Sequence, residues 1–154
     1  MVFAVVRIRG SINIKPDIKK TLQLLRLTRS NHCVLLEENT STKGMLQIVK
    51  DYVTWGEIEK EALSNLIQNR GKIIGDKTLS EDYIKSATSY INIEKLTQAI
   101  LDNKIKYRDI PDIKPIFRLN PPKKGYEGIK RSYINNGALG YRGKNINKLI
   151  TRMI

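Results

Sequence analysis

Histidine and cysteine are almost absent from this sequence. Its 154 residues include one histidine, His32, and one cysteine, Cys33. A single cysteine excludes a disulfide within the chain, and one residue of each type is too few for a zinc site of several such ligands. The two residues are adjacent, and neighbours on a strand point to opposite faces, so a thiol–imidazole pair is not expected. We therefore expect no cofactor, no metal and a reducing, intracellular environment.

Long apolar runs and catalytic patterns are also missing. No run approaches 18 apolar residues, so we expect no membrane span. The first ten residues, MVFAVVRIRG, lack the features of a signal peptide and are typical of a strand. Glu37 and Glu38 are adjacent at a strand end and face apart, and Lys72 lacks the context of a phosphate loop. The sequence thus indicates neither an enzyme nor a small-molecule substrate.

What the sequence has in excess is positive charge. It contains 28 Lys and Arg against 15 Asp and Glu, a net charge of +13. Residues 1–60 carry +4, residues 61–112 are neutral, and residues 113–154 combine ten basic side chains with one acidic one. Such an excess favours polyanionic partners, with nucleic acid ahead of an anionic membrane.

The first 58 residues alternate between strand-like and helix-like patterns. Strands are expected at 2–9, 33–36 and 53–55, and amphipathic helices at 17–27 and 40–52. We expect Asp17 to cap the first helix. This order predicts an α+β fold with a ferredoxin-like β-α-β-α-β core over 1–58, in which two helices cover one face of a small sheet.

The remainder divides into two segments. Residues 59–112 have helical periodicity and balanced charge, which predicts a helical insertion that packs on protein. Residues 113–154 begin with an edge strand near 115–119, followed by glycines that interrupt every period until a short terminal helix. We expect an extended basic arm here, ordered by RNA and mobile without it.

Cations alternate with tyrosines along this arm. Cations neutralise phosphates and tyrosines stack on unpaired bases, so the arm predicts an RNA contact; a solvated tail is the alternative. A second, weaker set of cations, which includes Arg26, Arg29 and Lys43, is equally compatible with ordinary surface charge. Trp55 is expected in the core rather than on a stacking platform.

Several motifs resemble one known family. They comprise the spacing Thr21-Leu22, Leu25, Leu27, Arg29, His32 and Val34, then KDYVTWGEI at 50–58, RLNPP at 118–122 and GALGYRG at 137–143. This pattern, which covers essentially the whole chain, resembles the large-subunit ribosomal protein thirty family (universal L-thirty) in its archaeal type, related to eukaryotic large-subunit ribosomal protein seven. Asn120 stands where the family usually has a histidine, which removes any imidazole role at this position.

The resemblance implies a cytoplasmic structural constituent of the large (50S) ribosomal subunit. Its implied partners are 23S rRNA, 5S rRNA nearby, and neighbouring large-subunit proteins. The resemblance also adds two segments to the candidate site: the link at 29–32, before the second strand, and the start of the second helix at 41–44. The complete set of expected RNA-binding residues is Arg26, Arg29, Asn31, His32, Ser41, Thr42, Lys43, Arg118, Lys123, Lys124, Tyr126, Lys130, Arg131, Tyr133, Tyr141, Arg142 and Lys144.

Two other functions remain open at this point. A free-standing nucleic-acid-binding regulator of translation or ribosome assembly would share the charge. A small enzyme on the same half-fold would need a cleft with convergent polar groups, which no motif indicates.

Overall fold

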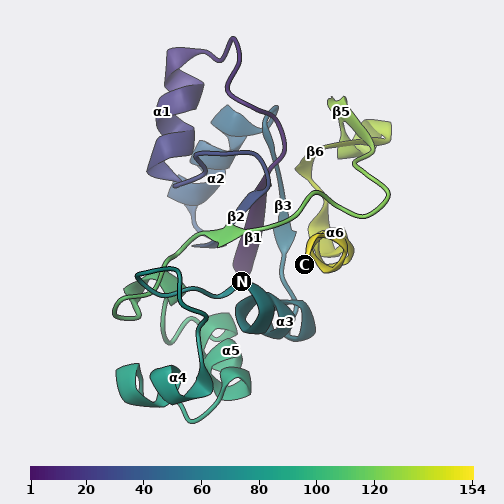
Figure 1. The fold of residues 1–154 in the computed structure, drawn as a ribbon. Helices are drawn as coiled ribbons and strands as arrows, with labels where there is room; N and C mark the ends of the chain where they lie inside the picture. The colour runs from purple at the N-terminus through teal and green to yellow at the C-terminus, as the bar shows by residue number, and fades with distance from the viewer.

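The computed structural model describes residues 1–154 and has α+β architecture (Figure 1). Its helices and strands are, in chain order, β1 (Val2–Arg7), α1 (Pro16–Leu24), β2 (His32–Glu37), α2 (Thr40–Val49), β3 (Val53–Glu57), α3 (Lys60–Arg70), α4 (Glu81–Ala87), α5 (Ile93–Leu101), β4 (Phe117–Arg118), β5 (Gly128–Ser132), β6 (Gly137–Tyr141) and α6 (Ile146–Met153). Three short 3-10 turns, η1 to η3, lie at Tyr107–Asp109, Tyr133–Asn135 and Gly143–Asn145.

All six strands belong to one mixed sheet in the order β4-β2-β1-β3-β6-β5. β1 is antiparallel to both β2 and β3, whereas β6 is parallel to β3. Every residue of β1 is buried, as expected for a central strand that is covered on both faces. β4 lies at one edge of the sheet, which confirms the edge position expected from Pro115.

Alternate side chains of β1 enter two separate cores. Phe3 and Val5 pack with Leu22 of α1, with Leu25 at its C-cap and with residues of α2, so two helices cover one face of the sheet, as predicted. Val2, Ala4 and Val6 face the opposite way, into a larger core with α3, α5 and α6. In Figure 1, α1 and α2 lie on one side of the sheet and α3 and α6 on the other.

The ends of the core helices differ in detail from the prediction. α1 begins at Pro16 and Lys15 occupies the N-cap position, so the expected Asp17 cap is wrong. Proline suits this position because its missing N–H has no partner in the first turn of a helix. α1 ends at Leu24, and Arg26 has a left-handed backbone with φ of 61°. Farther along, Ser80 and Asn92 cap α4 and α5 with their side-chain oxygens.

The C-terminal segment is folded, which corrects the expected extended arm. β5 and β6 form between residues 125 and 145 and extend the sheet beyond β3. A Cβ atom on Gly137 would lie 2.0 Å from the Arg131 carbonyl oxygen, so glycine permits the close turn between the two strands. α6 forms as predicted, with Ile146, Leu149 and Ile150 in the larger core that it shares with α3 and α5. No helix combines the length and apolar composition that a membrane crossing requires.

Candidate nucleic-acid interface

His32 lies among arginines beside the C-terminal end of β1. It opens β2 and pairs with Arg118 of β4 across the edge of the sheet. Burial, together with the positive charges of Arg118, Arg29 and Arg7, lowers the pKa of His32 below its usual value. The imidazole is therefore neutral at pH 7. Arg29 and Arg118 are exposed. Arg118 forms an ion pair with the exposed carboxylate of Asp76, at 3.4 Å.

The loop after β4 is fastened to this group of residues. The Leu119 N–H donates to the Asn31 carbonyl oxygen at 3.2 Å, and the Tyr126 hydroxyl donates to Asn31 Oδ1 at 2.6 Å. Between these two bonds the loop carries Lys123 and Lys124, both exposed. We call Arg29, Asn31, His32, Arg118, Lys123 and Lys124 the β4-edge surface. It joins two parts of the chain that the sequence separates by about 90 residues.

A buried arginine adds positive charge beneath this surface. Arg7 is 3% exposed and donates to the carbonyl oxygens of Leu27 and Arg9 and to the Ser11 hydroxyl. None of these acceptors is charged. Burial lowers the pKa of Arg7, yet a guanidinium stays protonated at neutral pH. Arg26, in the same turn as Leu27, is exposed. The buried charge of Arg7 thus has no ion-pair partner, because all of its acceptors are neutral.

The start of α2 lies at the opposite end of β1. Val6 pairs with Cys33, near the β4-edge surface, whereas Val2 pairs with Glu37, just before α2. Ser41, Thr42 and Lys43 therefore stand away from the β4-edge surface. Lys43 makes a 2.9 Å ion pair with Glu38, and the Thr42 N–H donates to Asn39 Oδ1 at 2.7 Å. Sequence reasoning grouped these positions with Arg29, and the structure separates them.

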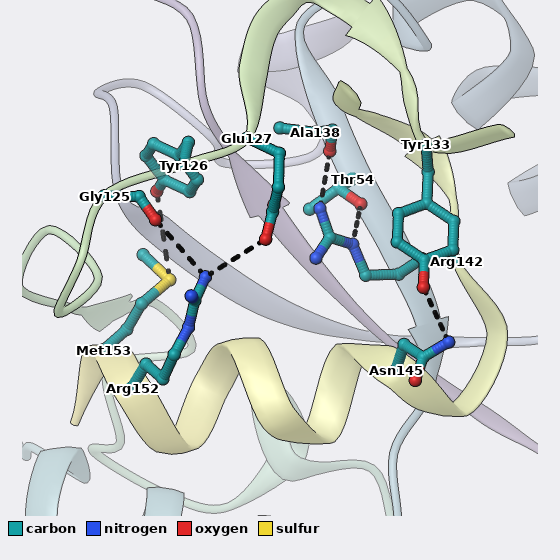
Figure 2. A network of polar contacts seen from close by, with 10 residues as sticks. All are labelled: Thr54, Gly125, Tyr126, Glu127, Tyr133, Ala138, Arg142, Asn145, Arg152 and Met153. Atoms are coloured by element: carbon teal, nitrogen blue, oxygen red, sulfur yellow. Dashed lines mark hydrogen bonds and ion pairs between the residues drawn. The ribbon is translucent and has the colours of Figure 1, made fainter. Parts of the chain in front are cut away.

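Arg142 has a structural role instead of the expected RNA contact (Figure 2). It is 6% exposed, and its Nε donates to Thr54 Oγ1 at 2.8 Å while a terminal nitrogen donates to the Ala138 carbonyl oxygen at 2.7 Å. The guanidinium also lies over the Tyr133 ring, 4.9 Å from its centroid. Its charge and donors are thus used inside the protein, which corrects the expectation that Arg142 binds RNA.

The tyrosines of this segment also use their hydroxyls within the protein. Asn145 Nδ2 donates to the Tyr133 hydroxyl at 2.7 Å (Figure 2), and Tyr141 donates to Glu57 Oε1 at 2.5 Å. The bond to the carboxylate raises the pKa of Tyr141 to about 12. Burial raises the pKa of Tyr126 to about 12 as well. The ring of Tyr141 is half exposed.

The free cations of the C-terminal segment lie on its outer edge. Lys130 and Arg131 belong to β5, the other edge strand of the sheet, and Lys144 lies in η3. All three are exposed and none forms an ion pair. Arg152 was not among the expected residues, yet it donates to the Gly125 carbonyl oxygen at 3.3 Å and lies 3.8 Å from Glu127, so it holds the loop of Lys123 and Lys124 (Figure 2). In the sequence, only the position of Arg152 among the apolar residues of α6 could have indicated that its side chain contacts this loop.

The residues that suggested other chemistry are structural. Cys33 is fully buried, and this burial raises its thiol pKa to about 12. Trp55 is 9% exposed and belongs to the core, as expected. No group of three or more His, Cys, Asp or Glu side chains converges on a metal-sized site. The arrangement as a whole presents fixed cations on a rigid sheet.

Comparison with known proteins identifies the family. Residues 3–53 match the family model described as ribosomal protein L30p/L7e. The large ribosomal subunit protein uL30 of Thermoplasma volcanium is 55% identical over 151 residues, which cover 98% of this chain and 92% of the relative. This chain belongs to the ribosomal protein L30p/L7e family. The uL30 proteins of Archaeoglobus fulgidus and Methanocorpusculum labreanum are 46% and 44% identical, each over 98% of this chain and 99% of the relative. The resemblance drawn from the motifs is confirmed, including its archaeal type.

Within the L30p/L7e family model, only part of the β4-edge surface is matched. Arg29, Asn31 and His32 fall inside residues 3–53, whereas Arg118, Lys123 and Lys124 fall outside. The archaeal relatives extend over both parts. The surface is therefore assembled from the segment that defines the family model and from the C-terminal segment that these longer relatives share.

Proposed function

We propose that this L30p/L7e family member is a structural component of the large ribosomal subunit that binds and stabilises 23S rRNA close to 5S rRNA, beside other large-subunit proteins. Its role is mechanical and electrostatic, with no catalytic step. The observation that carries the proposal is the β4-edge surface. There Arg29, Arg118, Lys123 and Lys124 come from two distant segments onto one rigid edge, and of these four only Arg118 forms an ion pair, with Asp76.

Fixed cations of this kind suit folded RNA. Each phosphate that a lysine or arginine neutralises releases counterions, which provides affinity without reading sequence. Because the cations are held by the sheet and by the Tyr126–Asn31 bond, their spacing selects RNA of matching shape. Lys130, Arg131 and Lys144 provide a second line of contacts at the opposite edge of the sheet.

A salt titration against large-subunit rRNA tests this surface. Replacing Arg29, Arg118, Lys123 and Lys124 by glutamine should reduce the log–log salt slope by about 3, at 0.7 to 0.9 per lost phosphate contact. The matched control replaces four exposed lysines of the neutral segment, Lys77, Lys85, Lys95 and Lys104, and removes the same charge. Equal slopes for the two variants would reject the β4-edge surface as the RNA site.

Sedimentation separates a ribosomal component from a free regulator. In a sucrose gradient of lysate from the source cells, the protein should migrate with 50S particles and leave them only at high salt. A free pool at the top of the gradient would contradict the proposal. Crosslinks from the intact particle to 23S and 5S rRNA would then test the expected neighbours.

A further inference from the structure

A cavity of about 100 Å³ lies between the sheet core and the segment that follows α5. Its apolar walls include Leu35 of β2, Ile100 of α5 and Ile105. One water needs about 10–15 Å³ of such space, so the cavity accommodates a group several times larger. It lies near the α2 start and not at the β4-edge surface, which contributes no residue to it.

The polar groups of this cavity have unused hydrogen-bonding capacity. The side chains of Asn103 and Thr42 make no hydrogen bond within the protein, and Asn39 uses only its Oδ1. Tyr107, which also lines the cavity, is 3% exposed, and its hydroxyl is the one buried side-chain polar atom without a partner. Burying a hydroxyl unsatisfied is costly, so this group is poised for a ligand that supplies an acceptor or a donor.

Cations line the same opening. Lys106 pairs with Glu37 at 3.4 Å, which links the insertion to the end of β2. Arg108 is exposed, and its nearest carboxylate, on the adjacent Asp109, is 4.0 Å away. An apolar slot with one buried hydroxyl inside, and with exposed amides, Arg108 and the Glu37–Lys106 pair at its rim, matches a nucleotide, whose base is a flat ring with a polar edge and whose phosphate is an anion.

We propose that this cavity receives one unstacked nucleobase of the bound RNA. The apolar walls contact the ring faces, the groups of Asn39, Asn103 and Tyr107 bond its polar edge, and Arg108 meets the attached phosphate. An apolar side chain from a partner protein would leave these polar groups unsatisfied, and a phosphate alone would not use the apolar walls. This inference rests on the proposed RNA binding and adds a base-reading site to a surface that reads phosphates.

The first test is NMR of the nitrogen-labelled full chain with four ribonucleoside 5′-monophosphates. The amide signals of Asn39, Asn103 and Tyr107 should shift with at least one nucleotide at millimolar concentration and stay in place with inorganic phosphate. Ile105→Trp, which fills the cavity from its half-buried wall, should abolish the shifts and leave the remaining spectrum unchanged. Equal shifts with inorganic phosphate, or shifts with cyclohexanol and none with any nucleotide, would overturn the proposal.

The second test uses large-subunit rRNA and Tyr107→Phe, which removes only the unpartnered hydroxyl. Binding should weaken about three- to ten-fold, the range of one hydrogen bond, with the salt slope unchanged. Tyr90→Phe removes another hydroxyl of the same insertion and should bind as the wild type does. If the wild type binds rRNA and Tyr107→Phe matches it, the base site is rejected while the proposed function stands. If the wild type does not bind rRNA, the proposed function itself fails.

Discussion

Nε of Arg142 lies 2.8 Å from Oγ1 of Thr54, so a buried guanidinium bonds the C-terminal segment to β3 across 88 residues of sequence. Arg142→Leu should lower the free energy of unfolding by about 2–4 kcal/mol, because Thr54 and the Ala138 carbonyl lose their donor. Urea unfolding of the free protein measures this. Lys144→Leu, an exposed neighbour, should change stability by less than about 0.5 kcal/mol. Equal stability of both variants would contradict the structural role.

Leu24, the last residue of α1, and Leu25, its C-cap, form a matched pair for testing which side of this helix end is buried. Leu25 is 6% exposed and packs in the core between the sheet and α1 and α2, whereas Leu24 is 66% exposed. Leu25→Asp should cost about 3 kcal/mol or more, because it places an unpaired carboxylate among apolar side chains. Leu24→Asp should leave the melting temperature almost unchanged. Thermal unfolding followed by circular dichroism checks both, and similar losses would show that the buried face of α1 is misassigned.

Cys33 should resist alkylation in the native protein. Its thiol is fully buried and has a pKa of about 12, so the reactive thiolate is scarce at pH 8. The reaction with iodoacetamide should be slow in buffer and rapid in urea. Cys33→Ala should leave rRNA binding within a few-fold of the wild type. Rapid native alkylation accompanied by loss of binding would disprove a purely structural cysteine.

The single histidine gives a clean pH prediction. The pKa of His32 is lowered in the folded state by burial and by the nearby guanidiniums, so the unfolded chain takes up the proton first as pH falls. The contribution of His32 to stability is complete above about pH 6.5 and is lost as the pH falls toward the folded pKa. One imidazole resonance, followed by NMR, should titrate below 6.5. His32→Gln should flatten the pH dependence of stability in this range, and an unchanged profile would contradict this origin.

Sequence periodicity predicted the elements whose burial follows a local pattern. The apolar residues of β1, α1, α2 and α6 recur at strand or helix spacing, so their cores could be inferred from neighbours in the chain. β5 and β6 could not, because GIKRS is mostly exposed and GALGY is broken by glycines. β6 exists through pairing with β3, far away in sequence, and β5 pairs in turn with β6. One of the glycines that suggested an irregular arm in fact permits close approach: a Cβ on Gly137 would lie 2.0 Å from the Arg131 carbonyl oxygen.

The same limit applies to the candidate site. The cations around Arg29 and Lys123 were identified from charge and motif, and both are exposed in the structure. Arg142 belonged to an equally basic motif, and only its distant acceptors on β3 and β6 show that it is internal. Tyr107 carried no sequence signal, because its significance depends on the absence of a partner for a buried hydroxyl. Charge can be counted from a sequence, whereas the burial of a side chain and its hydrogen-bond partners can be known only from the fold.

The position of α6 has a consequence for synthesis. Val2, Ala4 and Val6 of β1 leave the peptidyl transferase centre first, yet the helix that helps to cover them is the last element of the chain. At about 5–20 residues per second, α6 follows β1 by roughly 7–30 s. Throughout that interval one face of the nascent sheet is partly uncovered and open to aggregation. The newly made protein therefore has reason to be shielded by a chaperone until its final helix emerges.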